Sequence, residues 1–501
     1  MVLDFVNQSD YIWALLPELV LALWGMLILM VDVFQKGSEP GPSRPMIAWL
    51  TLGGIVAAAA ATGWLVGVEE SGTAGMMTVD GFRIFALLII LLAAAITVLL
   101  SIGYPEHTGI NRGEFYALLL FATVGMMVRA GPRGLRLFFI AFELMSIAVY
   151  VLVGFNRNDP RSAEGALKYF LLGAFSSAFL LYGIALIWGA TGTTNITEIG
   201  ALLGGALVTS GLFLTGAALL VIGLGFKVAA IPFHMWAPDA YDGAPTPITA
   251  LMATGVKAAA FAAFIRIFAG AFGGAYEVWS QVIWWLAIVT MFGANLIALT
   301  QGSVKRMLAY SSIAHAGYLL VALLSANAFG AAAFLFYLLT YTLMTAGAFG
   351  IVIANSRGGR ERFSLQDFAG FGWEQPVMGA VFAVLLLSLA GFPLTGGFIG
   401  KVYIVRAAVS AGYSGLAVAL VIASLISYFY YLRVVVLMYM RPAAEKASGA
   451  LEIPGPLRFA VTFAAASVLV LFFYAAPFLG AAEASVASLF TSPGAFFGLM
   501  P

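Results

Sequence analysis

The 501-residue chain is 62% hydrophobic and only 9% charged, with a formal net charge of +1 at pH 7. Soluble globular chains carry about 25% charged residues, so this composition excludes a large soluble domain and, with it, a dinucleotide-binding or nucleic-acid-binding module. The near-neutral charge indicates no polyanionic partner, and the absence of Cys excludes disulfides and thiolate-held iron–sulfur clusters.

Fourteen apolar stretches follow one another along the chain, most of them near the length of about 20 residues that a membrane-spanning helix needs. They cover residues 13–33, 47–68, 84–103, 115–128, 135–154, 166–190, 206–230, 247–269, 278–300, 307–325, 328–354, 377–409, 415–440 and 457–479. We therefore predict an all-α polytopic membrane protein with about 14 transmembrane helices, because barrel strands would alternate in polarity. The weakly apolar segment 485–500 is too short to span a membrane and is expected to form a tail.

Two of these stretches contain helix-breaking residues. The first runs Gly223-Leu-Gly-Phe-Lys227-Val-Ala-Ala-Ile-Pro232 and the second Ala390-Gly-Phe-Pro393-Leu-Thr-Gly396-Gly397. Pro and Gly free backbone carbonyls that lipid cannot satisfy, so such breaks persist where protein or water lines them. A packing kink would explain either break alone, whereas paired broken helices are typical of inverted repeats with ion sites near the membrane midplane.

Lysines dominate the ionisable residues inside the apolar stretches. Lys168, Lys227, Lys257 and Lys401 are four of the seven lysines in the chain. A Lys at the centre of a membrane helix costs about 2.5–3.5 kcal/mol, and Lys, unlike Arg, can lose its proton when it is desolvated. This pattern favours proton transfer. Snorkelling of the amine to the membrane surface is the alternative, above all for Lys168 near the end of its stretch.

Glu143 is the one carboxylate at comparable depth, and pairing with a Lys would allow it to ionise. His315 lies mid-stretch near Ser311 and Ser312 and could relay a proton, although a buried His bonded to a neighbour would need no such role. Four polar residues of the next stretch have helical spacing and could support a water chain: Tyr337, Thr340, Tyr341 and Thr345. Glu18 is expected at the membrane interface, and His234 and Asp239 in loop architecture.

Loop Lys and Arg residues predict the orientation. One side carries thirteen of them: Lys36, Arg44, Arg112, Arg157, Arg161, Lys305, Arg306, Arg357, Arg360, Arg362, Arg441, Lys446 and Arg458. The other side carries Arg83, Arg129, Arg133, Arg136 and Arg266. We predict that the richer side is cytoplasmic and that both termini lie outside, with the cluster Arg129, Arg133 and Arg136 opposing the rule.

Several longer motifs resemble the N-subunit family of respiratory complex I. They are Phe142-Glu143-Leu-Met-Ser, Ser162-Ala-Glu-Gly-Ala-Leu-Lys168-Tyr, Gly225-Phe-Lys227 through Pro232-Phe-His-Met-Trp-Ala-Pro-Asp239, Gly391-Phe-Pro-Leu-Thr-Gly-Gly-Phe-Ile-Gly-Lys401 and Tyr430-Tyr-Leu-Arg. The wider antiporter-like family includes the L and M subunits and Mrp-type sodium/proton antiporter subunits. The M subunit typically has Glu at the position of Lys401, and the long lateral arm typical of the L subunit is missing, so both comparisons favour N.

This resemblance implies two inverted five-helix repeats with discontinuous helices. The implied division is three N-terminal helices in 1–114, a first repeat in 115–270 broken near 227–232, a second repeat in 271–440 broken near 391–397, and a C-terminal helix and tail in 441–501. It also implies roles: Glu143 modulates Lys227, Lys168 tunes that pair, Lys257 is the central relay and Lys401 the terminal proton site. His315 is a further candidate on its own sequence evidence.

The resemblance further implies a proton-translocating subunit of NADH:quinone oxidoreductase in the bacterial inner membrane, with no cofactor or metal on this chain. Other subunits would handle NADH and quinone. The expected partners are the neighbouring M subunit, the small K, J, A and H subunits, and lipids, with no nucleic acid. A sodium/proton antiporter subunit of the Mrp type and a non-conducting structural membrane subunit stay open as alternatives.

Overall fold

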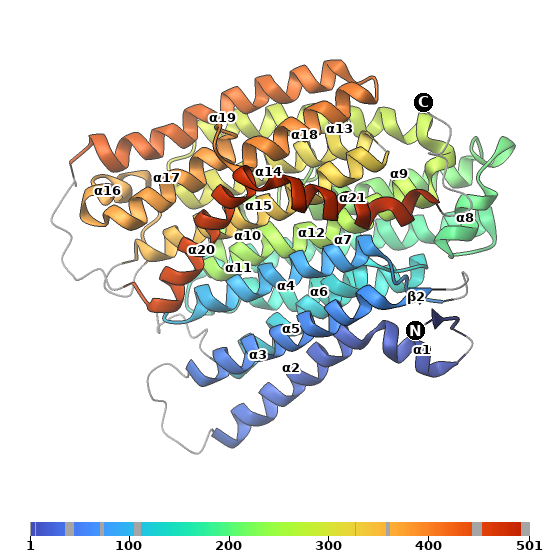
Figure 1. The fold of residues 1–501 in the computed structure, drawn as a ribbon, viewed down its shortest axis with the longest axis horizontal. Helices are drawn as coiled ribbons and strands as arrows, with labels where there is room; N and C mark the ends of the chain where they lie inside the picture. The colour runs from blue at the N-terminus through green and yellow to red at the C-terminus, as the bar shows by residue number, and fades with distance from the viewer. Residues whose placement is uncertain are drawn as a thin grey trace.

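Long apolar helices packed side by side form the body of the protein (Figure 1), a computed structural model that describes residues 2–5, 7–35, 45–70, 75–104, 112–325, 327–356, 361–442 and 453–491. The helices are α1 (Gln8–Ala14), α2 (Leu16–Gln35), α3 (Pro45–Trp64), α4 (Gly81–Ser101), α5 (Gly113–Ala130), α6 (Leu135–Val153), α7 (Pro160–Thr191), α8 (Ile196–Leu202), α9 (Gly211–Val228), α10 (Ala237–Gly243), α11 (Thr246–Leu251), α12 (Lys257–Ile265), α13 (Tyr276–Leu299), α14 (Val304–Leu324), α15 (Ala328–Ala354), α16 (Phe371–Glu374), α17 (Pro376–Ala390), α18 (Gly396–Ser410), α19 (Ser414–Met440), α20 (Gly455–Phe473) and α21 (Ala475–Thr491). Two parallel strands of two residues, β1 (Val2–Leu3) and β2 (Glu69–Glu70), complete the fold.

Thirteen helices in the described part of the chain are long and apolar enough to cross a membrane. They confirm the predicted polytopic all-α class. The predicted stretch at 377–409 is split into α17 and α18, each of 15 residues. The two half-length helices together account for the remaining predicted crossing.

Burial separates central from peripheral helices. In an apolar 18-residue window of each span, all residues of Thr246–Ala271 and 94% of those of α14 and α15 are buried, against 39% for α7 and α19. Lys257 and His315 therefore belong to helices without a lipid-facing side, which excludes snorkelling for both side chains.

Both helix breaks lie at the Gly- and Pro-containing motifs. α9 ends before Ala229 and α17 ends before Gly391, and these two residues have left-handed φ values of 60° and 88°. At each break, the next residue donates a backbone hydrogen bond to the carbonyl five residues earlier: Ala230 N–H to Gly225 O, and Phe392 N–H to Leu387 O. This is the same C-terminal motif at both ends, so the two breaks share their backbone geometry.

The span Thr246–Ala271 contains two π-helical segments that were not predicted. Segments Met252–Val256 and Arg266–Ala271 are π-helical and flank α12, whose first residue is Lys257. Single π turns occur frequently at functional positions because they shift the following side chains around the helix axis.

The C-terminal region differs from the predicted tail. After a bend at Tyr474, α21 runs to Thr491 and packs against α4 and α15, and residues 492–501 lie outside the described part. Figure 1 shows α1, α8 and the end of α21 at one end of the bundle and α16 at the other. Helix α1 and the end of α21 therefore lie at the same end of the bundle.

Candidate functional site in the membrane interior

Lys227 lies in the last turn of α9, immediately before the first break, and is 2% exposed. Its amine donates to Ser146 Oγ at 2.8 Å and to Tyr169 Oη at 3.2 Å. The rings of Phe142, Tyr150 and Tyr169 lie around it, with Nζ 4.9–5.4 Å from their centres. Aromatic faces and hydroxyls thus replace water around this cation.

Glu143 is half-buried and accepts a hydrogen bond from Ser177 Oγ at 2.5 Å. No ion pair within 4 Å joins it to Lys227 in the described structure, in contrast to the expected direct pair. The reason is local: Ser146, one turn further along α6, occupies the position next to the amine. Sequence spacing places both residues near Lys227 but does not decide which one bonds to it.

Lys168 faces the end of the bundle and is not part of the buried interior. It is 43% exposed and bonds to Glu164 at 2.6 Å and Asp239 at 2.7 Å. Asp239 also accepts a bond from Arg306 at 3.0 Å. Burial raises the pKa of Asp239, but the bonds from Lys168 and Arg306 lower this pKa more, so the carboxyl stays ionised. Asp239, which lies in the short helix α10 and not in a loop, therefore links α7 and α14.

Lys257 is 1% exposed and points to α14. Its amine donates to the backbone oxygen of Ser312 and to Ser312 Oγ, the latter at 2.5 Å. Tyr341 of α15 donates to the same hydroxyl at 2.9 Å. The serine hydroxyl thus connects the lysine to the polar side of α15 that was predicted from helical spacing.

His315 lies between two tyrosines. Its Nδ1 is 2.6 Å from Tyr337 Oη and its Nε2 is 3.3 Å from Tyr431 Oη. Tyr431 also bonds to Ser311, one turn before His315 on α14. Both ring nitrogens therefore have hydroxyl partners, the arrangement that a proton relay requires.

Lys401 bonds across the second break. Its amine donates to the backbone oxygens of Leu389 at 3.0 Å and Ala390 at 2.7 Å, the last carbonyls of α17. These carbonyls have no partner within their own helix. The ring of Tyr318 lies 4.9 Å from Nζ. A lysine from α18 thus satisfies the break that the Gly and Pro residues create.

Polar residues outside the predicted set of site residues connect these groups. Tyr430, the residue before Tyr431 on α19, donates a hydrogen bond to Asn295 Oδ1 at 2.9 Å. The Asn295 amide nitrogen in turn donates to Tyr318 Oη at 3.2 Å. Their only sequence signal is that they are polar residues in apolar stretches. In the described structure, hydrogen bonds and ring contacts therefore form a nearly continuous polar path from Lys257 to Lys401.

Four of the five basic residues predicted for the sparser side are buried: Arg83, Arg129, Arg133 and Arg266. Arg83 bonds to Glu18 at 2.7 Å, and Arg266 bonds to Asp80 at 2.9 Å. Glu18 is 3% exposed, so it is a buried partner and not an interface residue. On the richer side, in contrast, Arg112, Arg157 and Arg441 are exposed in connections, Arg161 and Arg458 are exposed in the first turns of α7 and α20, and Lys305 is buried. Lys36, Arg44, Arg357, Arg360 and Lys446 lie outside the described residues.

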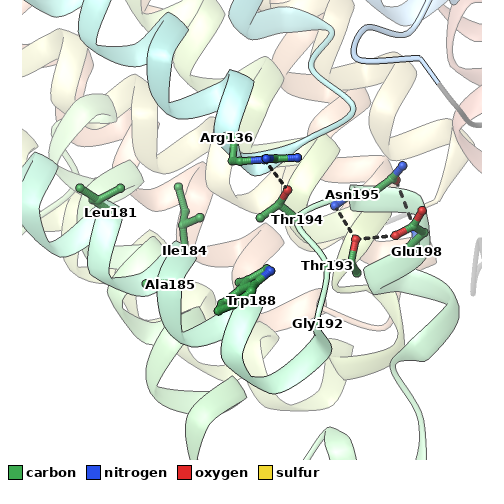
Figure 2. A pocket seen from close by; sticks show the side chains of 10 residues that line it. All are labelled: Arg136, Leu181, Ile184, Ala185, Trp188, Gly192, Thr193, Thr194, Asn195 and Glu198. Carbon is green, nitrogen blue, oxygen red and sulfur yellow. Dashed lines mark hydrogen bonds between the residues drawn. The ribbon is translucent and has the colours of Figure 1, made fainter. Parts of the chain in front are cut away.

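Figure 2 shows a pocket of about 610 Å³ at the end of α7. Its apolar wall includes Leu181 and Trp188, and Arg136 donates to Thr194 at its polar side at 3.1 Å. None of the predicted site residues lines it. Within the described ranges, no group of three or more His, Asp or Glu residues is arranged to hold a metal ion.

Comparisons with known proteins agree with this geometry. Residues 133–427 match the family model described as NADH:quinone oxidoreductase/Mrp antiporter, TM. The chain is similar to NADH-quinone oxidoreductase subunit N of Trichlorobacter lovleyi, with 46% identity over 468 residues that cover 92% of this chain and 94% of the relative. It is also similar to a chain in respiratory complex I from Thermus thermophilus with bound aureothin, with 35% identity, a TM-score of 0.80 and coverage of 94% and 100%. A chain of the Mrp complex from Dietzia shares the fold, with a TM-score of 0.82 at 21% identity over 98% of this chain and 99% of that one.

Proposed function

Because the chain belongs to the subunit N family of NADH-quinone oxidoreductases, within the NADH:quinone oxidoreductase/Mrp antiporter transmembrane family, we propose that it is a proton-translocating membrane subunit of complex I. Its lysines would carry protons across the membrane while quinone reduction proceeds on other subunits. The chain is thus part of an oxidoreductase without being expected to hold a redox centre itself.

One observation carries this proposal: within the described part of the chain, Lys227, Lys257 and Lys401 bond only to neutral oxygens. Lys227 contacts hydroxyls, Lys257 a hydroxyl and a carbonyl, and Lys401 two carbonyls. A carboxylate partner would hold the proton on the amine, as Glu164 and Asp239 do for Lys168. Neutral partners stabilise both the charged and the uncharged amine, as a group that alternates between the two requires.

We propose the following order of proton-transfer steps. A change at Glu143, driven from the neighbouring subunit, alters the field at Lys227, which then releases its proton inward to Lys257 through water. Ser312, Tyr341, His315 and Tyr431 carry the proton toward Lys401, from which it leaves the membrane. In this scheme Lys168 acts from a distance through Asp239, because its amine lies at the end of the bundle.

Replacement of Lys227 tests the function. In Lys227→Met the complex should assemble and oxidise NADH, while proton translocation per NADH in inside-out vesicles falls to background. Lys227→Arg should fail in the same way, because Arg keeps its charge but does not release a proton. Arg433→Met, which removes an exposed cation on α19, is the matched control and should pump normally.

Normal pumping by Lys227→Met or by Lys227→Arg in an assembled complex would contradict the proposal. Sodium-dependent proton exchange in vesicles without NADH would favour an antiporter, the function of the Mrp relatives that share this fold. For assembly, we propose contact with the M subunit and the small K, J, A and H subunits in a bacterial inner membrane, supported by the family membership.

A further inference from the structure

Arg129 is a buried cation whose guanidinium lacks the usual partners. It lies in the last turn of α5 and is 0% exposed. Its Nη1 contacts Met145 Sδ at 3.9 Å, and its Nε and Nη2 have no hydrogen-bond partner among the described residues. Its Cζ lies 4.7 Å from the ring centre of Phe142 and 5.4 Å from that of Phe138.

Two other buried arginines, Arg83 and Arg266, each have a carboxylate partner, although Arg83 Nε has no hydrogen-bond partner among the described residues. Arg83 binds Glu18 and two backbone oxygens, and Arg266 binds both oxygens of Asp80. A long apolar side chain would fill the site of Arg129 without leaving polar groups unsatisfied. Packing therefore does not explain why this position holds a group that cannot lose its charge.

The direction of the side chain follows from the helix. Side chains lean toward the N-terminus of their own helix, so a residue in the last turn of α5 leans back along the bundle. Arg129 thereby reaches Met145, in the middle of α6, and does not extend past the end of α5.

Arg129 and Lys227 share the ring of Phe142. The ring centre is 4.7 Å from the guanidinium carbon and 4.9 Å from the amine. Around α6, Arg129 contacts the side with Phe138, Phe142 and Met145, and Lys227 the adjoining side with Phe142 and Ser146. Going around the axis of α6 from the side of Arg129 to the side of Lys227, the next side chain in this turn is that of Glu143. Lys227 therefore lies between a fixed cation and a carboxylate.

From this geometry we propose that Arg129 is a positioning residue for proton transfer, a permanent positive charge that drives the proton off Lys227. This inference rests on the proposed function. Glu143 on the other side favours the charged amine, and Arg129 opposes it. Any movement of the Glu143 carboxylate away from Lys227 would leave the repulsion by Arg129 unbalanced, and the proton would leave.

Other titratable groups that face Lys227 do not replace Arg129. Tyr150 of α6 and Tyr169 of α7 are neutral at physiological pH. Lys257 starts α12, which packs on α9, but its amine is directed to Ser312 on α14. Lys168 of α7 is paired with two carboxylates. Arg129 is the cation on the Lys227 side of α6 that no carboxylate neutralises in the described structure.

The test is the pH profile of proton translocation per NADH in the intact complex. In Arg129→Gln and Arg129→Met the acid-side midpoint should move to higher pH by about one unit, a tenfold change in proton concentration. Both charges lie within 4.9 Å of the Phe142 ring centre, so they are at most about 10 Å apart. At that separation and an effective dielectric constant of about 20, the repulsion of two unit charges corresponds to about one pH unit. Arg136→Gln removes an equal but exposed charge near the start of α6 and should not move the midpoint.

Three results would overturn the inference: an unchanged midpoint in both neutral variants, a shift in only one of them, or failure of both to assemble, which assigns Arg129 a structural role. Failure of the proposed function gives a different result, because Lys227→Met would then pump normally. Loss of pumping in Lys227→Met with an unshifted Arg129→Gln profile refutes the Arg129 inference alone.

Discussion

Buried charges in this chain differ in what satisfies them. Arg83 and Arg266 bond to carboxylates, as structural cations in a membrane interior do. Among the residues that the structure describes, the partners of Lys227, Lys257 and Lys401 are hydroxyls and carbonyls. Residue type and depth identified the lysines from the sequence, because the cost of burying a charge depends on its local apolar stretch. Their partners come from other helices and were not predictable.

Asp239 gives a residue-scale prediction about pH. Its pKa is below the usual value because Lys168 and Arg306 stabilise the carboxylate. Its contribution to stability is therefore fully present above the unfolded pKa of about 3.9 and is lost as the pH falls through the lower folded value. Asp239→Asn should lower the unfolding temperature of the detergent-solubilised complex equally at pH 6 and pH 8. Because the group is near the surface, the loss should be modest.

The control is the same comparison in acid, at about pH 3, where the difference between Asp239→Asn and the parent should shrink. A difference that changes between pH 6 and pH 8 would contradict the assignment of Asp239 as a permanently ionised link between α7 and α14.

At the scale of the element, the two broken helices end by one motif but use their lysines differently. Lys227 lies in the helix that ends, whereas Lys401 comes from the helix that restarts and binds the free carbonyls of α17. Gly and Pro made the positions of the breaks predictable, because their backbone restrictions are local. The π turns beside Lys257 have no such local signal.

Gly397 should tolerate no side chain. It lies in the first turn of α18, and a Cβ at this position would overlap the backbone oxygen of Ser388 in α17. Gly397→Ala should therefore push the two half-helices apart, destabilise the fold by about 1–3 kcal/mol and reduce the yield of assembled complex. Thermal unfolding of the purified complex measures the loss.

Gly415→Ala is the matched control, because this glycine in the first turn of α19 has open space around its Cβ position. It should be neutral or slightly stabilising. Equal stability of the Gly397→Ala and Gly415→Ala complexes would show that α17 and α18 are not in close contact at the break.

For the whole molecule, the exposure of the basic residues bears on the predicted orientation. The opposing arginines are mostly buried in the bundle, so they do not act as loop charges. Arg136 is the exposed member, against five exposed arginines in the described connections and helix ends of the other side. We propose that the side with the five exposed arginines is cytoplasmic.

Single cysteines test this orientation, because the chain contains none. Asn158, between α6 and α7, and Thr209, between α8 and α9, are both exposed and lie in connections at opposite ends of the bundle. In inside-out vesicles an impermeant maleimide should label Asn158→Cys and not Thr209→Cys. The reverse pattern would invert the topology and place both termini in the cytoplasm.

Sequence alone determined the membrane fold, the positions of both helix breaks and the burial of Lys227, Lys257 and Lys401, because each depends on hydropathy or backbone restriction within one stretch of chain. Tertiary structure alone decided the partners. Tyr431 of α19 contacts His315, and Ser146 bonds to Lys227 at the position where Glu143 was expected. Arg129, which was predicted to be a loop residue, is buried and contacts the same Phe142 ring as Lys227. Contacts between distant helices depend on how whole faces pack, which no local pattern contains.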